Sequence, residues 1–340
     1  MKYLEDPRRV DPRSTMPGVR SLIVCALNYN PGLPYSTEIK NCENTAGAPR
    51  GWISRYAWGD DYHEVLWGKL NALAVEMRAH FPEPFEVRVY SDTGPVHERA
   101  AAKYAGLGWL AKNTLLINQS LGSWLFLGVV LTSLPLTPTL GPAEVPPPDR
   151  CGTCRRCLDA CPTEAIVEPY VLDASRCISY LTIELRGAIP EDFREAMGRH
   201  VFGCDICQDV CPWNRKSPRT GLVEFKPRSL AANDNGADEE TLFLPDLLRI
   251  ASLTQEEFRE LFRGSPVKRT KWQGLVRNAC IALGNQSVEA GSDKFRKITG
   301  TLQSLSECGE AVIAESARWA LWRIQANGNA QLPASDPDRS

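Results

Sequence analysis

Eight of the chain's twelve cysteines lie in one stretch, between Cys151 and Cys211, with a spacing that could bind metal. The first group reads Cys-x2-Cys-x2-Cys-x3-Cys-Pro, and the second repeats this order with one cysteine fewer. This spacing is typical of bacterial ferredoxins, whose thiolates bind 4Fe-4S clusters. The eight residues are Cys151, Cys154, Cys157 and Cys161, then Cys177, and finally Cys204, Cys207 and Cys211. Eight thiolates are enough for two four-iron clusters.

In two-cluster ferredoxins the fourth cysteine of a motif binds the neighbouring cluster. That rule assigns cluster 1 to Cys151, Cys154, Cys157 and Cys211, and cluster 2 to Cys161, Cys177, Cys204 and Cys207. Zinc is a weaker alternative because all-cysteine zinc sites use two separate Cys-x2-Cys hairpins. Disulfides are weaker still if the chain stays in the cytosol, where thiols are kept reduced. The other four cysteines, Cys25, Cys42, Cys280 and Cys308, are expected to be ordinary packing residues.

Composition bounds the class of protein. The 340 residues are 43% hydrophobic and 24% charged, which excludes a disordered or collagen-like chain. The net charge of -2 gives no chain-wide basic field, although it is compatible with a local basic patch. The first twenty residues contain no apolar run, so we expect no secretory signal and a cytoplasmic protein. Residues 113–143 are uncharged, but their apolar runs are too short to span a bilayer, so no membrane association is expected.

The elements that must position the cysteines alternate in type along the first part of the chain. Residues 21–27 and 85–90 have the pattern of strands. Residues 60–80 have helical spacing between them, with Asp60 or Asp61 as the N-cap. Interleaved strands and helices predict a mixed α/β domain.

Two further buried strands are predicted at residues 115–117 and 124–131, joined by a Gly-Ser turn. A proline-rich spacer at residues 142–148 then separates the α/β domain from the cysteines. We therefore expect a first domain over residues 1–145 and a ferredoxin-type domain over residues 146–225.

The last part of the chain is predicted to be helical. A polar linker or loop over residues 226–240 precedes a helical domain at 241–328, and residues 329–340 are expected to be a disordered tail. Apolar stripes at helical spacing mark the segments 242–250, 254–262, 272–283 and 311–324. Residues 277–285 and 316–324 resemble two copies of one helix, with small residues where helices would touch, which favours HEAT-like repeats. The fold class is thus an α+β multidomain protein.

Several segments together resemble the epoxyqueuosine reductase family. They are Ile53 to His63, Tyr90 to Thr114, Gly122 to Gly128 ahead of the double cysteine module, Ser265 to Lys271, and Arg277 to Asn285. The match runs in order from about Tyr3 to Ile324. Members of that family are cytosolic enzymes that use cobalamin and two 4Fe-4S clusters. They reduce the epoxide of epoxyqueuosine, at the tRNA wobble position, to the alkene of queuosine in the last step of queuosine biosynthesis.

The resemblance implies an α/β cobalamin-binding domain at residues 1–145, although the family normally has several tens of residues before the motif that begins here at Tyr3. It implies that Asp92, in Ser91-Asp92-Thr93-Gly94-Pro95, is the general acid. Epoxide reduction needs one, because the departing alkoxide is a poor leaving group until it is protonated. The alternative is that the segment is only a turn between a strand and a helix.

The same resemblance implies cobalamin contacts from Arg55, Tyr56, Tyr62 and His63, together with Asp92. His63 is expected to line the site without binding cobalt. Lys112, Asn113 and Thr114 are candidates for the corrin amides or the nucleotide tail. A capped turn ahead of the strand at Leu115 is the competing interpretation.

A local basic strip fits a tRNA partner. Residues 263–277 contain five positive charges and no acidic residue. On a helical repeat such a strip can follow a phosphate backbone, and a solvated face is the alternative. The residues predicted to contact the anticodon stem-loop are Lys216, Arg219, Lys268, Arg269, Lys271 and Arg277.

The prediction is therefore an oxidoreductase, expected to be a monomer, that takes electrons from an external low-potential donor. Two rivals belong to other classes. A reductive-dehalogenase-like enzyme would share cobalamin and both clusters but is expected to have an export signal. A non-catalytic ferredoxin-type electron carrier would share only the clusters and would not need the Asp92 segment.

Overall fold

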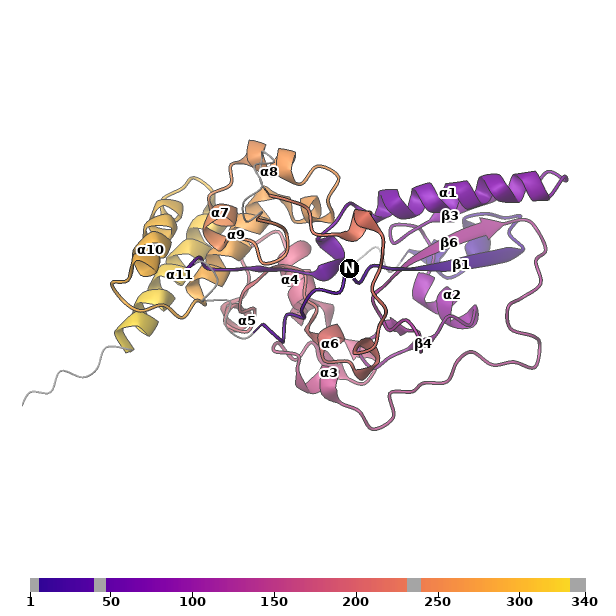
Figure 1. The fold of residues 1–340 in the computed structure, drawn as a ribbon, viewed down its shortest axis with the longest axis horizontal. Coiled ribbons are helices and arrows are strands. Elements are labelled where there is room, and N and C mark those ends of the chain that lie inside the picture. The colour runs from indigo at the N-terminus through magenta and orange to yellow at the C-terminus, as the bar shows by residue number, and fades with distance from the viewer. Residues whose placement is uncertain (1–5, 40–46, 231–239, 331–340) are drawn as a thin grey trace, which may run out of the picture. The chain divides into compact units, whose positions relative to one another are not determined.

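The computed structural model describes residues 6–39, 47–230 and 240–330, with side chains to residue 326 (Figure 1). The chain forms two compact units, each built from three separated stretches. Unit 1 comprises Met1–Pro34, Gly59–Ala174 and Ile206–Lys226; unit 2 comprises Tyr35–Trp58, Ser175–Asp205 and Pro227–Ser340. These units differ from the consecutive domains expected from the sequence. Composition marks where a chain changes character, but it does not show which distant stretches pack together.

The centre of unit 1 is a three-stranded antiparallel sheet in the order β1-β6-β3. Its strands are β1 (Ser21–Asn28), β3 (Val87–Tyr90) and β6 (Leu125–Thr132). In register, Ser21 pairs with Thr132 and Tyr90 pairs with Val129. The strands predicted at 21–27, 85–90 and 124–131 are thus confirmed, with small shifts at their ends.

Helix α1 (Tyr62–His80) covers one face of this sheet (Figure 1). Asp61 caps it by accepting the backbone N–H of His63, which confirms one of the two predicted caps. The helix approaches β6 closely at Gly128, where an added Cβ would lie 2.8 Å from the side chain of Leu70. Strand residues alternate between faces, so Val129 on β6 points the other way, into a cluster with Met16 and Val96.

The two further strands predicted at residues 115–117 and 124–131 are both confirmed. Both β5 (Leu116–Ile117) and β6 exist, but β5 pairs with β4 (Trp109–Leu110), whereas β6 pairs with β1 and β3. A Gly-Ser turn does connect the two segments in sequence, but it sends them to different sheets. Unit 1 also contains α2 (Glu98–Tyr104), α3 (Arg156–Asp159), β7 (Ile166–Glu168), β8 (Val171–Leu172) and α6 (Ile206–Asp209).

Unit 2 is mainly helical. Its elements are β2 (Trp52–Ile53) paired in parallel with β9 (His200–Phe202), and α4 (Ile178–Ile183), α5 (Glu191–Arg194), α7 (Leu247–Ala251), α8 (Gln255–Leu261), α9 (Lys271–Gly284), α10 (Asp293–Ser306) and α11 (Ala311–Ala330). The helix predicted from residue 242 begins only at Leu247, because Pro245 interrupts it and Asp246 caps it. Helix α10 was not predicted. Its apolar stripe is short, with Ile298 and Leu302 as its buried residues.

Small residues do lie where the two similar helices α9 and α11 meet. A Cβ on Gly284 would come within 2.8 Å of Ala320, so the glycine permits the close packing. The HEAT-like repeat stays a prediction from the sequence. Within the described ranges, no helix combines the length and apolar character needed to cross a membrane.

Candidate functional site

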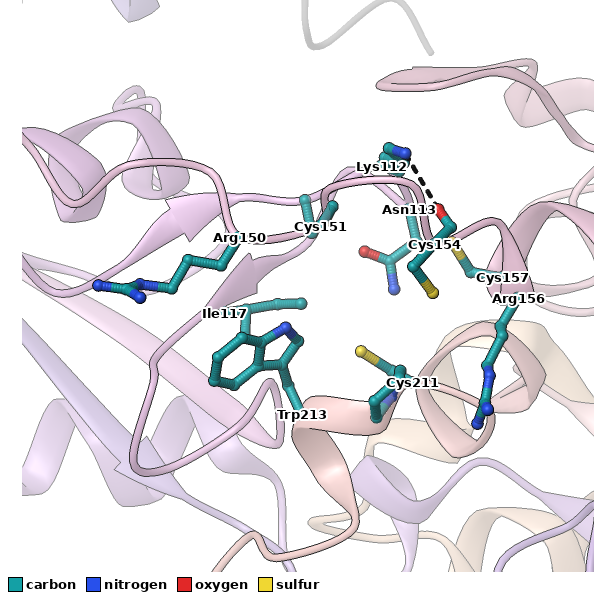
Figure 2. A pocket seen from close by; sticks show the side chains of 12 residues that line it. Lys112, Asn113, Ile117, Arg150, Cys151, Cys154, Arg156, Cys157, Cys211 and Trp213 are labelled. Atoms are coloured by element: carbon teal, nitrogen blue, oxygen red, sulfur yellow. Dashed lines mark hydrogen bonds between the residues drawn. The ribbon is translucent and has the colours of Figure 1, made fainter.

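Four cysteines from two distant stretches surround one cavity in unit 1 (Figure 2). Cys151 and Cys154 come from the loop that leads into α3, Cys157 lies in the first turn of α3, and Cys211 follows α6. The cavity has a volume of about 230 Å³. In Figure 2 the sulfur atoms of Cys154 and Cys211 point toward the same space. These four residues are the predicted ligands of cluster 1.

The local backbone explains how three of these thiols share a centre. The N–H of Cys154 donates to the carbonyl of Cys151 at 3.0 Å, which closes a tight turn. Gly152 inside that turn has a φ of +51°, a left-handed conformation that glycine adopts without steric cost. The turn therefore brings residues three apart to one side of the loop.

The thiols are close enough to affect one another electrostatically. The pKa of Cys211 is raised to about 11, mainly by burial and also by the charges of Cys151, Cys157 and Cys154. Burial is also the main reason why the pKa values of Cys151 and Cys157 are raised. A bound metal centre reverses this balance, because coordination deprotonates a thiol outright. Four thiolates around one space would repel one another, and a bound metal centre would neutralise that repulsion.

Trp109 gives an independent test of the fit. Its side chain is 1% exposed and packs with Ile117 and Cys211, against Cys151. Among the described residues its indole N–H finds no hydrogen-bonded acceptor, although its proximity lowers the pKa of Cys151 against the larger effect of burial. A buried unsatisfied donor costs roughly 1–3 kcal/mol. Cluster sulfur beside Cys151 would satisfy it.

The cavity suits a cluster better than a single zinc ion. In the described part of the chain, no three His, Cys, Asp or Glu side chains converge tightly enough to hold one metal ion. Zinc binds thiolates at about 2.3 Å, so it would need the sulfur atoms drawn much closer together. Thiols spread around a cavity match the larger 4Fe-4S core.

A second constellation lies where α1 begins and β3 ends. The hydroxyl of Tyr62 donates to Oδ2 of Asp92 at 2.8 Å. His63 lies between two carboxylates, with Nδ1 2.7 Å from Oδ1 of Asp61 and Nε2 3.5 Å from Oδ2 of Asp92. The Tyr62 ring stacks on His63 and on Phe126 of β6, with centroid distances of 4.1 and 4.4 Å. The sheet thus holds the acid–base groups of two separate segments together.

The charge of His63 follows from this placement. Burial alone would lower its pKa, but hydrogen bonds and charges from Asp61 and Asp92 outweigh it and raise the pKa to about 9. The imidazole is therefore protonated at neutral pH, and both ring nitrogens face carboxylates. The expectation that His63 binds no cobalt stays a prediction.

The backbone of Asp92 is unusual. Its φ is +57°, in the left-handed region that few residues other than glycine adopt. Its amide N–H donates to Oε1 of Glu98 at 2.6 Å, and its side chain is about half exposed. Asp61 and Glu98 were not among the predicted site residues. Asp61 could have been found as the helix cap, whereas nothing in the spacing marks Glu98.

Comparison with known proteins agrees with this geometry. The family model for epoxyqueuosine reductase QueG matches residues 9–93, and the model for the 4Fe-4S double cluster binding domain matches residues 150–214. The epoxyqueuosine reductase of Xanthomonas campestris pv. campestris is 38% identical over 314 residues, covering 92% of this chain and 81% of its own length. The chain belongs to the epoxyqueuosine reductase family.

Two solved structures of the family are similar over nearly the whole chain. One is an epoxyqueuosine reductase with an epoxyqueuosine-modified stem-loop of tRNA-Tyr. It has a TM-score of 0.77 and 30% identity, over 96% of this chain and 82% of that one. The other is the Bacillus subtilis enzyme with its catalytic loop swung out of the active site. It has a TM-score of 0.74 and 31% identity, over 93% and 77% of the two chains.

Two residues expected to contact cobalamin in an epoxyqueuosine reductase instead line the cysteine cavity. Nζ of Lys112 donates to the carbonyls of Gly152 and Cys154, at 2.6 and 3.0 Å (Figure 2). Nδ2 of Asn113 donates to the carbonyl of Cys207 at 3.3 Å. Their side chains thus tie the β4–β5 hairpin to the cysteine loops. Thr114, with a φ of +64°, follows them, and its carbonyl accepts a bond from Arg99.

Arg55 and Tyr56, the other predicted cobalamin contacts, belong to unit 2, whereas Tyr62, His63 and Asp92 belong to unit 1. The Arg55 side chain is 1% exposed and lies over the rings of Tyr35 and Trp58, at 5.1 and 4.7 Å from their centroids. Its backbone N–H donates to the buried Asp205 at 2.7 Å. Tyr56 is half-buried, with its ring 5.9 Å from that of Phe202.

The predicted ligands of cluster 2 divide between the units: Cys161 and Cys207 lie in unit 1, and Cys177 and Cys204 in unit 2. This set stays a prediction. Of the four cysteines expected only to pack, Cys280 is fully buried, and Cys25 and Cys308 are partly buried free thiols. Cys42 lies outside the described residues.

One predicted tRNA contact is contradicted. Arg277 is completely buried, and its guanidinium donates to the carbonyls of Leu181, Leu185 and Gly187 at 2.7–2.8 Å. A phosphate cannot reach it, because its charge serves to bind α9 to the α4 segment. The other five residues are exposed: Lys216 and Arg219 in unit 1, and Lys268, Arg269 and Lys271 in unit 2. Arg269 also pairs with Glu184 at 2.5 Å.

Proposed function

We propose that this chain reduces the epoxide of epoxyqueuosine, at the wobble position of tRNA, to the alkene of queuosine. The observation that carries the proposal is the joint presence, in unit 1, of a four-thiol cavity and an acid–base cluster at Asp92. The two sites have different chemical roles, since iron-sulfur clusters carry electrons and carboxylates move protons. A reaction that consumes both explains why one unit holds them.

The stoichiometry requires this combination. Removing the epoxide oxygen breaks two C–O bonds, forms one C=C bond, and consumes two electrons and two protons to release water. The electrons come from an external low-potential donor through the iron-sulfur clusters, each of which transfers one at a time. Asp92 delivers a proton to the departing oxygen, because its half-exposed carboxyl is open to a substrate.

The neighbours of Asp92 have distinct roles in this scheme. Protonated His63 returns a proton to Asp92 after each transfer, over the 3.5 Å between Nε2 and Oδ2. Tyr62 holds the Asp92 carboxyl in place through its 2.8 Å hydrogen bond. Asp61, 5% exposed, orients the imidazole from the other side. The order of proton movement is therefore from His63 to Asp92 to the oxygen.

The cofactors are two 4Fe-4S clusters and cobalamin. Cys151, Cys154, Cys157 and Cys211 bind cluster 1, and Cys161, Cys177, Cys204 and Cys207 bind cluster 2. Cobalamin, when bound, supplies a strongly reducing cobalt centre. The residues 1–145 expected to form its α/β domain are divided between unit 1 and, at Tyr35–Trp58, unit 2. Tyr62, His63, Asp92 and Thr114 in unit 1, and Arg55 and Tyr56 in unit 2, would contact the corrinoid. Lys112 and Asn113 line the cluster 1 cavity instead.

The tRNA partner is bound by its anticodon stem-loop. Exposed cations on the HEAT-like helices and after Cys211 contact its phosphates, so binding should weaken steeply with salt. These residues are Lys216, Arg219, Lys268, Arg269 and Lys271. A structure of a relative with a modified tRNA stem-loop supports a tRNA partner, and the charge and exposure of these five residues support their role in binding it. A tRNA substrate places the reaction in the cytoplasm, and the enzyme acts as a monomer.

The direct test is anaerobic turnover of an epoxyqueuosine-containing stem-loop, with iron and sulfide reconstituted, cobalamin added and a low-potential chemical reductant. We expect nucleosides that have lost one oxygen atom, detected by mass spectrometry, and no product when cobalamin is omitted. Reduced clusters without any product would favour an electron carrier. Turnover of a halogenated compound but not of the stem-loop would favour a dehalogenase-like enzyme.

A further inference from the structure

The proton donor stands on a strained backbone. A residue other than glycine in the left-handed region is strained and persists there when its surroundings hold it. Asp92 has a φ of +57° and directly follows Ser91 at the end of β3. The strain matters because the backbone conformation sets the direction of the Asp92 side chain toward Tyr62 and His63.

A side chain from the next helix holds this backbone. Oε1 of Glu98, the first residue of α2, accepts the N–H of Asp92 at 2.6 Å. The turn is also closed by Thr93, whose N–H donates to the carbonyl of Ser91 at 2.7 Å. Ser91 is tied to β6 through a 2.9 Å bond from its hydroxyl to the carbonyl of Leu127. Glu98 thus holds the residue between two anchored neighbours.

The surroundings of Glu98 suit a role inside the protein more than one in solvent. Burial is the main cause that raises its pKa to about 7, against the hydrogen bond from Asp92, which lowers it. A glutamate fully exposed to solvent would not have its pKa raised by burial. Two residues earlier, Val96 is 3% exposed in the core cluster with Val129, so the start of α2 is fixed to the sheet.

We propose that Glu98 is a positioning residue for proton transfer: its carboxylate holds the main chain of Asp92 in the left-handed conformation that keeps the Asp92 carboxyl against Tyr62 and His63. This inference rests on the proposed function of Asp92. It assigns to Glu98 no contact with the substrate. In the Bacillus subtilis relative the catalytic loop is swung out of the active site.

Three variants separate the roles. Glu98→Leu removes the acceptor, Glu98→Asp shortens it, and Glu98→Gln keeps a carbonyl oxygen at the same distance. We expect kcat to fall on the order of 10- to 100-fold in Glu98→Leu, with an unchanged KM for the stem-loop, because misplacing a reacting group has effects of this size. The kcat of Glu98→Asp should lie between those of Glu98→Leu and the unaltered chain, and Glu98→Gln should keep most of the activity. Glu64→Leu, which removes an acidic residue from the first turn of α1, is the matched control.

A readout without turnover accompanies these measurements. Hydrogen–deuterium exchange on the cluster-loaded full chain should show faster exchange at residues 91–93 in Glu98→Leu and Glu98→Asp, but not in Glu98→Gln or Glu64→Leu. In an Asp92→Asn background, Glu98→Leu should cause no further loss of turnover, since it acts only through the carboxyl that is already absent.

The opposite results would overturn the inference. They are unchanged exchange at residues 91–93 in Glu98→Leu, or an equal loss of turnover with and without the Asp92 carboxyl. Failure of the proposed function looks different: the unaltered chain would form no queuosine, while the exchange at residues 91–93 would still respond to Glu98→Leu and so support the contact itself.

Discussion

The cysteine cavity and the Asp92 cluster lie in the same unit but are specified in different ways. Three of the four thiols around the cavity come from the short stretch 151–157, so their relation is local in sequence. The Asp92 cluster joins the start of α1 to the end of β3, and it exists only because both elements pack on β6. The thiol cavity depends mainly on local spacing, whereas the Asp92 cluster depends on the tertiary fold.

Because of this difference, substitutions at the two sites should have different effects. A cavity that depends on ligand identity should lose its cofactor when one thiol is lost, while the fold around it survives. A cluster that depends on the sheet should keep its structure when one carboxyl is neutralised and lose only its chemistry. Four substitutions test this contrast.

The largest effect is expected from Cys211→Ala. Cluster 1 loses the one ligand that comes from a distant stretch, so we expect about half of the bound iron and all turnover to be lost. Iron content and the EPR spectrum of the reduced protein measure this. Cys25→Ala, at a partly buried thiol of β1, is the control and should keep the full iron content. Full iron content in Cys211→Ala would mean that Cys211 is not a ligand.

Asp92→Asn should separate the two sites. The amide cannot act as an acid, so turnover should fall on the order of 10²- to 10⁴-fold, while iron content and corrinoid retention stay unchanged. Single-turnover analysis of the stem-loop measures the first, and absorption spectra measure the second. Asp159→Asn, at an exposed carboxyl of α3, controls for the change in charge. Undiminished turnover would remove Asp92 from the mechanism.

His63→Gln should change how stability depends on pH. The pKa of His63 is raised from 6.5 to about 9 in the folded chain, so its protonated form favours folding. The stabilisation is fully present below about pH 6.5 and is lost as the pH rises toward 9; by linkage it is on the order of 1–3 kcal/mol. Urea unfolding of the cluster-loaded protein should show this decline in the unaltered chain and a flatter profile in His63→Gln. Parallel profiles would contradict it.

The smallest expected effect concerns Trp109→Phe. Hydrogen bonds to cluster sulfur raise the reduction potential, so removing the indole N–H should make the midpoint potential of cluster 1 more negative without loss of iron. EPR-monitored redox titration measures this. Trp213→Phe, on the ring 5.0 Å away, keeps the packing and should leave the potential nearly unchanged. Equal shifts in both variants would indicate a packing effect.

The parts predicted from sequence are those with local causes. The capped helix from Tyr62 to His80 follows from Asp61 and a regular apolar stripe, and the spacing of the cysteines pointed to the four that line one cavity. The prediction that Arg277 contacts tRNA was wrong, because a run of charges in the sequence does not show which side chain points inward. There the carbonyls of Leu181 and Leu185 satisfy a buried guanidinium, a contact across about ninety residues.

Other contacts could not be predicted from the sequence because they also depend on the tertiary structure. Lys112 was assigned to a cofactor through the family resemblance, and the structure shows that its ammonium binds two carbonyls of the cysteine loop. Glu98 became visible only with the left-handed backbone of Asp92 beside it. Pairing partners of short strands such as β5 also depend on the whole unit, since two residues carry too little pattern to choose a neighbour.

The discontinuity of unit 1 bears on how the enzyme matures during synthesis. Its stretches Met1–Pro34 and Gly59–Ala174 leave the ribosome well before Ile206–Lys226. The loop with three of the cluster 1 thiols is therefore made first, and Cys211 arrives only after the intervening part of unit 2. Iron-sulfur insertion into this cavity has to wait until about two thirds of the polypeptide has been translated, which makes cofactor loading a late event in the life of the nascent chain.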